Sequence, residues 1–232
     1  NDVELDNFCS QCLLVINAVG PSFKINDKIA LHALRNNCHY IDIGGYGILR
    51  DLLKPYEKSI EAQKLCFIIG VGWMPGISGV FSKTIIETHL NSPENTNFNI
   101  YYGAVDNWSY SSTYDLAASS MGKTRSYVYS HGKEIQVSPF RYTHHKFFPF
   151  IGHKKICMPS FDEQLTQLAT SLKQIRKIST FIMLNDYISM GKFMFIKIFY
   201  KHNLNKATLM LQDDYQRLVK KENKWGSVIC QV

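Results

Sequence analysis

The first ninety residues alternate between strand-like and helix-like patterns of hydrophobic and polar positions. Three short, mostly apolar runs have the length of buried strands: residues 13–17, 39–43 and 65–69. Three longer segments are predicted to be helices: residues 25–37, residues 52–63 with Pro55 near the first turn, and residues 75–89, opened by Pro75-Gly76. Strict alternation of strand and helix predicts parallel strands joined by right-handed crossovers.

The pattern changes after residue 92, where residues 92–95 have the composition of a linker. The apolar stretch at residues 180–200 is interrupted by three charged side chains, which predicts one or two amphipathic or buried helices and argues against a membrane span. Other expected elements are strands at residues 98–102, 126–130 and 134–137, the last two as a hairpin around residues 131–133, a helix at residues 161–173, and a strand at residues 224–232.

These patterns predict an α/β chain in two domains. Residues 1–91 are expected to form a partial Rossmann-like parallel sheet. Residues 92–232 are expected to form an α+β domain of the catalytic or dimerisation type, which stops inside a strand. The chain is 45% hydrophobic, which is enough for substantial cores, and it has no low-complexity tract.

Charge is unevenly distributed between the two halves. Residues 1–100 hold 8 Lys and Arg against 10 Asp and Glu, whereas residues 101–232 hold 18 against 9. A basic second half is typical either of a solvated basic face or of a surface for anionic ligands or nucleic acid. Residues 139–155 mix bases with aromatics and contain two candidate ligands for an anionic substrate, Arg141 and His145. No nucleic-acid-binding module pattern is present, which argues against that partner.

Six cysteines are present, and their spacing gives no zinc-finger pattern. Cys38 and Cys66 lie in apolar settings and are expected to be small core residues. His144 and His145 are adjacent, and adjacent side chains of a strand face opposite sides, so they would make a poor metal pair; residues 139–155 otherwise have the composition of a structured basic loop. No signal peptide is recognised, so we expect a cytoplasmic, reducing environment, no resident metal and no membrane partner.

Candidate chemistry gathers where the three predicted strands end. These ends run into polar or glycine-rich turns, and ligands of parallel sheets bind beyond the carboxyl ends of strands. The stretch GVGWMPG at residues 70–76 approximates a dinucleotide fingerprint, but Trp73-Met74-Pro75 is bulky for a pyrophosphate loop. The alternative is a proline-initiated helix whose free amides accept an anion such as a substrate carboxylate.

Three stretches together resemble the saccharopine dehydrogenase-like family of NAD(P)-dependent oxidoreductases: VINAVGPSF at residues 15–23, IALHALRNNCHYIDIGG at residues 29–45, and GVGWMPGISGVF at residues 70–81. The resemblance implies hydride transfer between NADP or NAD and an amino-acid-derived imine or secondary amine. It covers residues 10–90 well and the β-rich remainder only loosely.

The resemblance also implies roles for the turn residues. Those beside the cofactor would be Asn17, Ala18, Val19, Gly20, Pro21, Asp42, Gly44 and Gly72. Those near the substrate would be Trp73, Met74, Pro75 and Gly76, to which the basic stretch adds Arg141 and His145. The candidate proton carriers are Tyr46, Asp106, His131 and His145, and the pattern does not choose among them.

One departure from the family is large. Its phosphate-binding strand and GxGxxG loop precede the VINAVGP segment, whereas the twelve residues before Leu13 contain no glycine. We therefore expect either a fragment of such an oxidoreductase or a degenerate member that serves as a non-catalytic scaffold. A homodimer and an amino-acid-like small-molecule substrate are the expected partners of the catalytic form.

Overall fold

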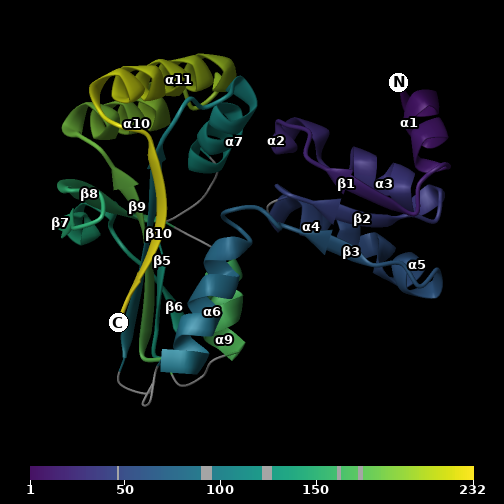
Figure 1. The fold of residues 1–232 in the computed structure, drawn as a ribbon, viewed down its shortest axis with the longest axis horizontal. Helices are drawn as coiled ribbons and strands as arrows, with labels where there is room; N and C mark the ends of the chain where they lie inside the picture. The colour runs from purple at the N-terminus through teal and green to yellow at the C-terminus, as the bar shows by residue number, and fades with distance from the viewer. Residues whose placement is uncertain (46, 90–95, 122–126, 161–162, 172–174) are drawn as a thin grey trace. The chain divides into compact units, whose positions relative to one another are not determined.

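The computed structural model describes residues 1–45, 47–89, 96–121, 127–160, 163–171 and 175–232. It divides into two compact units, residues 1–80 and residues 81–232, which we call unit 1 and unit 2 (Figure 1). The helix α6 (Ile77–His89) begins in unit 1 and continues into unit 2. The predicted linker at residues 92–95, and with it the predicted domain boundary, lies outside the described residues.

Unit 1 contains a three-stranded parallel sheet in the order β1-β2-β3, as the alternating pattern predicts (Figure 1). Its strands are β1 (Leu14–Asn17), β2 (His39–Asp42) and β3 (Phe67–Ile69). Its helices are α1 (Asp2–Cys9), α2 (Ser22–Ile25), α3 (Lys28–Arg35), α4 (Gly47–Leu53), a 3-10 turn over Lys54–Tyr56, and α5 (Glu57–Ala62). Pro55 lies in that 3-10 turn, between two helices where the sequence predicts one.

The two faces of this sheet differ because side chains alternate along each strand. Val15 and Tyr40 point into the core of unit 1, where they pack with residues of α1, α3 and α4. Ile16, Ile41 and Ile68 are aligned across the three strands on the opposite face. Ile16 and Ile68 are exposed there and Ile41 is half-buried, so this face is apolar and open to solvent.

The helix α1 lies in a segment for which the sequence predicts no element. It is held by a capping box, in which the Asn1 side chain accepts from the Glu4 amide and the Glu4 carboxylate accepts from the Asn1 amino group. Its single fully buried residue is Cys9, so it carries little of the apolar periodicity by which a helix is recognised. Cys66 is exposed, so its predicted place in the core is wrong, whereas Cys38 is buried as predicted.

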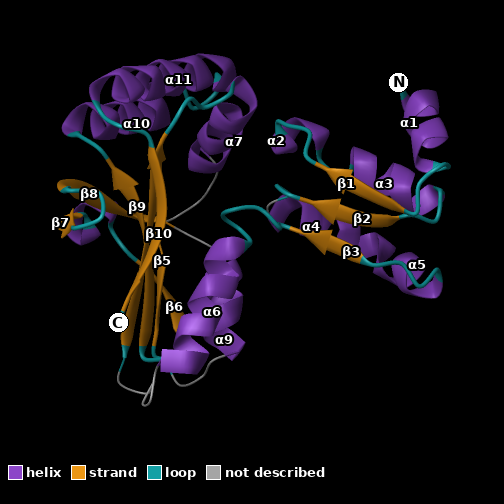
Figure 2. Ribbon diagram, viewed as in Figure 1, coloured by secondary structure: helices purple, strands orange, loops and turns teal. Residues whose placement is uncertain are grey.

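Unit 2 is built on a mixed sheet in the order β10-β4-β9-β5-β6, with β8 pairing both β9 and β7 (Figure 2). Its strands are β4 (Asn97–Val105), β5 (Tyr127–Ser130), β6 (Lys133–Gln136), β7 (His144–Phe148), β8 (His153–Ser160), β9 (Lys177–Leu184) and β10 (Trp225–Gln231). Its helices besides α6 are α7 (Tyr110–Met121), α8 (Pro139–Tyr142), α9 (Glu163–Ser171), α10 (Tyr187–Phe199) and α11 (Leu204–Lys221).

The helices of unit 2 pack on the sheet through two apolar clusters. One joins α6 and α9 to β4, β5 and β9. The other joins α7, α10 and α11 to β8 and β9. The predicted hairpin around residues 131–133 is confirmed, with His131 and Gly132 both at positive φ. A parallel sheet in unit 1 and a mixed sheet in unit 2 give a Rossmann-like α/β fold followed by an α+β unit.

The prediction of helix throughout residues 180–200 is wrong for its first part. Residues 180–184 belong to β9, which lies between β4 and its neighbours β5 and β8 and is buried on both faces. A central strand of this kind is apolar without alternation, so periodicity does not distinguish it from a buried helix. The change to helix occurs at Asp186, which caps α10 by accepting from the Ser189 amide at 2.9 Å.

Two charged clusters connect the helices of unit 2. Arg217 donates to Asp186 at 2.7 Å and to Asp214 at 2.9 Å, which joins α11 to the first turn of α10. Lys155 on β8 is only 2% exposed. Its ammonium group donates to Asn185 at 2.6 Å and to Glu222 at 2.9 Å, and it lies 4.9 Å from the centre of the Trp225 ring. Both clusters are satisfied internally.

Candidate functional site

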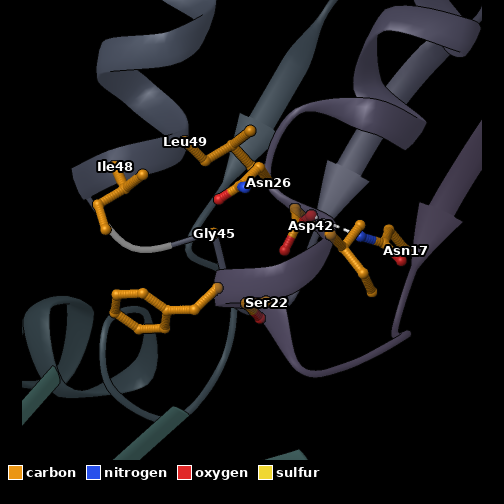
Figure 3. A pocket seen from close by; sticks show the side chains of 9 residues that line it. Asn17, Ser22, Asn26, Asp42, Gly45, Ile48 and Leu49 are labelled. Atoms are coloured by element: carbon orange, nitrogen blue, oxygen red, sulfur yellow. Dashed lines mark hydrogen bonds between the residues drawn. The ribbon is translucent and has the colours of Figure 1, made fainter. Parts of the chain in front are cut away.

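The end of β1 is organised by the side chain of Asn17. Its amide nitrogen donates to Asp42 at 2.7 Å and to the Tyr40 hydroxyl at 3.0 Å, and its oxygen accepts from the Val19 amide at 3.0 Å. Asn17 and Asp42 are paired residues of adjacent parallel strands, and both are buried. The strand ends in Asn because this one side chain both closes the following turn and binds the carboxylate of the neighbouring strand (Figure 3).

Tyr40 completes this network by donating its hydroxyl to Asp42 at 2.5 Å. Burial, followed by the hydrogen bond to Asp42, raises the pKa of Tyr40 far above its ordinary value. The phenol is therefore a neutral donor that holds Asp42 in place. The sequence signal for Tyr40 is its position two residues before Asp42, because side chains two apart on a strand share a face.

Removing the Tyr40 hydroxyl tests this network. We expect Tyr40→Phe to lower the free energy of unfolding of unit 1 by about 2 kcal/mol, because a buried carboxylate loses one of its donors. The native-state pKa of Tyr40 is raised, so its contribution to stability is present below about pH 10 and is lost as the pH rises above it. Urea unfolding at neutral and alkaline pH measures both effects.

The matched control for this test is Tyr187→Phe. Tyr187 is exposed, and its hydroxyl lies 2.8 Å from Nε2 of His145. We expect this variant to change stability by less than about 0.5 kcal/mol. Equal losses in the two variants would contradict the structural role of Tyr40.

A small depression lies beside this network, between α2 and α4 (Figure 3). Its lining residues are Asn17, Ser22, Phe23, Ile25, Asn26, Asp42, Gly45, Ile48 and Leu49. Its enclosed volume of ≈ 10 Å³ is about what one water molecule requires. Gly45 is one of the lining residues, and next to it in the chain a Cβ on Gly44 would lie 2.2 Å from Oγ of Ser22. A nicotinamide ring therefore does not fit inside the depression. The turn Ala18-Val19-Gly20 that follows β1 is exposed.

The glycines of the GVGWMPG segment pack against the chain itself. A Cβ on Gly72 would lie 2.5 Å from the Ile43 carbonyl oxygen, and one on Gly76 would lie 2.2 Å from the Gly72 carbonyl oxygen. The loop is further closed by the Val71 amide, which donates to the Asp42 carbonyl at 3.0 Å. Close backbone contact within unit 1 thus accounts for these glycines. Trp73 stays partly exposed, and Met74 and Pro75 are half-buried.

The prediction of free amides at the start of α6 is wrong. The Ile77 amide donates to the Gly72 carbonyl at 2.9 Å, and the Ser78 amide donates to the Trp73 carbonyl at 3.1 Å. The Gly79 and Val80 amides both donate to the Gly76 carbonyl. Because the preceding loop folds back over the helix start, the four amides that would receive an anion are already bonded.

The remaining candidates lie in unit 2 or outside the described residues. Arg141 is exposed on α8. His145 is exposed and bonded to Tyr187, whereas His144 packs edge-on against Phe181, so the two histidines face opposite sides as predicted. His131 lies 2.9 Å from the Ser130 hydroxyl at the tip of the hairpin.

The two other candidate proton carriers are Asp106 and Tyr46, and the structure supports a catalytic role for neither of them. Asp106 pairs with Lys224 at 2.9 Å, and the hydrogen bond from Lys224 lowers the pKa of Asp106. Tyr46 lies outside the described residues. Within the described ranges, no three His, Cys, Asp or Glu side chains gather as a metal site requires, and no helix is long and apolar enough to cross a membrane.

With this geometry in place, the chain can be compared with known proteins. Neither the known family models nor the curated proteins contain a match to this sequence. Among solved structures, the chain is similar to an apo histidine-tagged saccharopine dehydrogenase (L-Glu forming) from Saccharomyces cerevisiae. The TM-score is 0.59 and the sequence identity is 19%. The likeness is one of fold.

The two chains differ in extent. The match covers 83% of this chain and 46% of the saccharopine dehydrogenase chain, so this chain spans about half the length of its structural neighbour. It confirms the predicted fold class, a Rossmann-like parallel sheet with a second α+β unit. The residues that sequence reasoning missed at the site are Tyr40 and lining residues in or next to α2 and α4, such as Ser22, Asn26 and Leu49. Short helices such as α2 leave no period in the sequence by which they could be found.

Proposed function

We propose that the chain is part of a saccharopine dehydrogenase-like oxidoreductase. In this proposal NADP or NAD binds with its nicotinamide end beyond the carboxyl ends of β1 and β2. The reduced nucleotide would supply a hydride to an amino-acid-derived imine, and in the reverse direction the oxidised nucleotide would accept it from the corresponding secondary amine. The observation that carries the proposal is the fixed turn after β1, where an internally bonded Asn17 presents an exposed Ala18-Val19-Gly20 backbone at the ligand-binding edge of a parallel sheet.

In unit 1, the buried residues would hold the turn in place, and the exposed residues would contact the nucleotide. Asn17 and Asp42 bond to each other and so hold the turn, leaving contact with the nucleotide to Ala18, Val19 and Gly20. Gly44 lies against Ser22, where a side chain would not fit. Trp73, which is partly exposed, would border the ring or the substrate. The fold likeness to a saccharopine dehydrogenase supports this assignment.

Two residues of unit 2 are proposed substrate ligands on chemical grounds. Arg141 is exposed and offers a planar cation that suits a carboxylate. His145 offers a ring nitrogen held by Tyr187. Both suit the carboxyl groups of an amino-acid-like substrate.

Titration with NADPH and with NADH, followed by nucleotide fluorescence, tests the proposal. We expect saturable binding with a dissociation constant below about 1 mM, and a loss of at least about tenfold in affinity in Val19→Glu, because the new carboxylate would repel the nucleotide phosphates. Val19 is 60% exposed, so this change should leave the fold intact.

Val3→Glu on α1 is the matched control, since Val3 is 69% exposed and lies outside the turns at the strand ends. It should bind nucleotide as the unaltered chain does. An equal loss in both variants, or no binding of either nucleotide up to millimolar concentration, would overturn the nucleotide site. The second outcome would favour the non-catalytic scaffold, in which the strand-end turns serve only the internal packing seen at Asn17, Gly72 and Gly76.

A further inference from the structure

The helices α10 and α11 pack side by side on the sheet of unit 2, yet their outer faces differ in chemistry (Figure 1). On α11 the exposed positions are mainly polar or charged, with Leu209 as the exposed large apolar residue. On α10 the exposed large side chains are Tyr187, Ile188, Phe195, Ile198 and Phe199. An apolar outer face on a surface helix is unusual, because such helices normally present polar residues to water.

These exposed residues of α10 form one continuous face. At about 100° per residue, they fall within an arc of roughly 120° on the helix. The opposite side carries Ser189, Phe193 and Ile196, which are buried against the core of unit 2. The helix is therefore apolar on both sides, and its two lysines, Lys192 and Lys197, lie on the flanks between them.

Aromatic rings are concentrated at the C-terminal end of this face. The Phe195 and Phe199 rings lie 4.5 Å apart, and the Tyr200 ring stands edge-on to Phe195 at 5.5 Å. Exposed Lys201, His202 and Lys206 follow directly in the chain. Aromatic rings beside basic side chains are the combination that occupies the boundary between lipid headgroups and acyl chains.

The segment that runs from α10 into the first half of α11 carries charge of a single sign, and the nearest acidic side chains, Asp186 and Asp214, are paired with basic ones. Residues 187–212 include four lysines and one histidine but no aspartate or glutamate. Lys192 is paired with Asp214 of α11 at 3.0 Å, whereas Lys201 and Lys206 are exposed near the aromatic end. A second copy of the chain docking through this face would bring like charges together, which disfavours self-association. An anionic surface is complementary to it.

We propose that the outer face of α10 binds an anionic phospholipid surface, with the helix lying in the plane of the interface. Ile188, Phe195, Ile198 and Phe199 would enter the headgroup and acyl boundary, while the exposed Lys201 and Lys206 would contact lipid phosphates. The 13-residue helix, about 20 Å long, is too short to span a bilayer, so this mode differs from the membrane span that the sequence argues against. This proposal departs from the sequence-based expectation of no membrane partner.

Co-sedimentation of the full chain with lipid vesicles tests the proposal. Vesicles of phosphatidylcholine alone are compared with vesicles containing about one-third phosphatidylserine. We expect binding to the anionic vesicles, weakened by salt, and a loss of at least about tenfold in the partition coefficient for Ile198→Glu. Lys201→Glu should weaken binding by about fivefold or more, because it removes one cation and adds an anion.

Leu209→Glu on α11 is the matched control. Ile198 is 65% exposed and Leu209 is 53% exposed, so neither substitution should unfold unit 2. Retained vesicle binding in Leu209→Glu supports the assignment to α10. An equal loss in the two variants, or no binding of the unaltered chain to anionic vesicles, overturns it. A dimer in light scattering that Ile198→Glu dissociates would also overturn it and would assign the face to a second copy of this chain.

Discussion

Gly76→Ala is expected to destabilise unit 1 by about 4 kcal/mol or more. Gly76 has φ of +127°, a conformation that is costly for any residue with a side chain. A Cβ there would also lie 2.2 Å from the Gly72 carbonyl oxygen and 2.7 Å from the Gly72 nitrogen, both of which are backbone atoms. The loop would have to open, and the bond from the Ile77 amide to Gly72 would be lost. Hydrogen exchange of the β1, β2 and β3 amides measures the change.

Gly132→Ala is the control for Gly76→Ala. It introduces a side chain at positive φ without the steric clash that a Cβ would meet at Gly76. Gly132 has φ of +79°, but no atom lies within 4 Å of a Cβ placed there. We expect this variant to cost only about 1 kcal/mol, within unit 2, which urea unfolding measures. If Gly76→Ala costs no more than Gly132→Ala, the close packing of the GVGWMPG loop is not what stabilises it.

Glu222→Gln is expected to destabilise unit 2 by about 3 kcal/mol. The substitution leaves the Lys155 ammonium group almost fully buried without a carboxylate partner, and an uncompensated buried charge is costly. Asn185 and the Trp225 ring remain as partners of Lys155, and Glu222 is itself partly exposed. The expected loss of stability is therefore at the low end of the values known for breaking a buried ion pair. Urea unfolding of the full chain measures the change.

Lys155→Met in the Glu222→Gln background tests the cause. A methionine keeps the apolar stem and removes the charge, so we expect it to recover most of the lost stability. Lys154→Met is the control, because Lys154 is exposed and its loss should be nearly neutral. A double variant as unstable as Glu222→Gln alone would show that the contacts of Glu222, and not the charge of Lys155, account for the effect.

Much of unit 1 was predictable because its signals are local. Each strand of the parallel sheet is a short apolar run, and each run ends in a distinct turn, so residues 13–17, 39–43 and 65–69 were assigned correctly to within two residues. It was not predictable that the turn residues would bond to, and pack against, other parts of the same unit. Asn17 and Asp42 looked like free ligands in the sequence, because their bond joins residues 25 positions apart. In the same way, Gly72 and Gly76 suggested a close approach of the backbone to a ligand. In the structure these glycines instead allow close contact between backbone segments of unit 1.

Unit 2 was less predictable because its strands pair over long distances. β4 pairs in parallel with β9 and antiparallel with β10, and neither partner is close in sequence. The hairpin of β5 and β6 was found because its turn is local. The strands β7 and β8 were not predicted, because residues 139–155 looked like a basic surface loop. Lys155 illustrates the difficulty, since nothing in a run of two lysines shows that only the second is buried.

The open face of the unit 1 sheet bears on the colloidal behaviour of the protein. Ile16, Ile41 and Ile68 form an apolar row across three strands, and unit 1, residues 1–80, carries 7 basic against 8 acidic side chains. The charge of unit 1 therefore adds little local repulsion between two such faces, and the repulsion between two copies comes from the net charge of +7 of the whole chain, which salt screens. Sulfate and phosphate strengthen the burial of apolar surface, so high concentrations of these salts favour precipitation through this face. Storage at moderate ionic strength with weakly excluded salts keeps the chain dispersed.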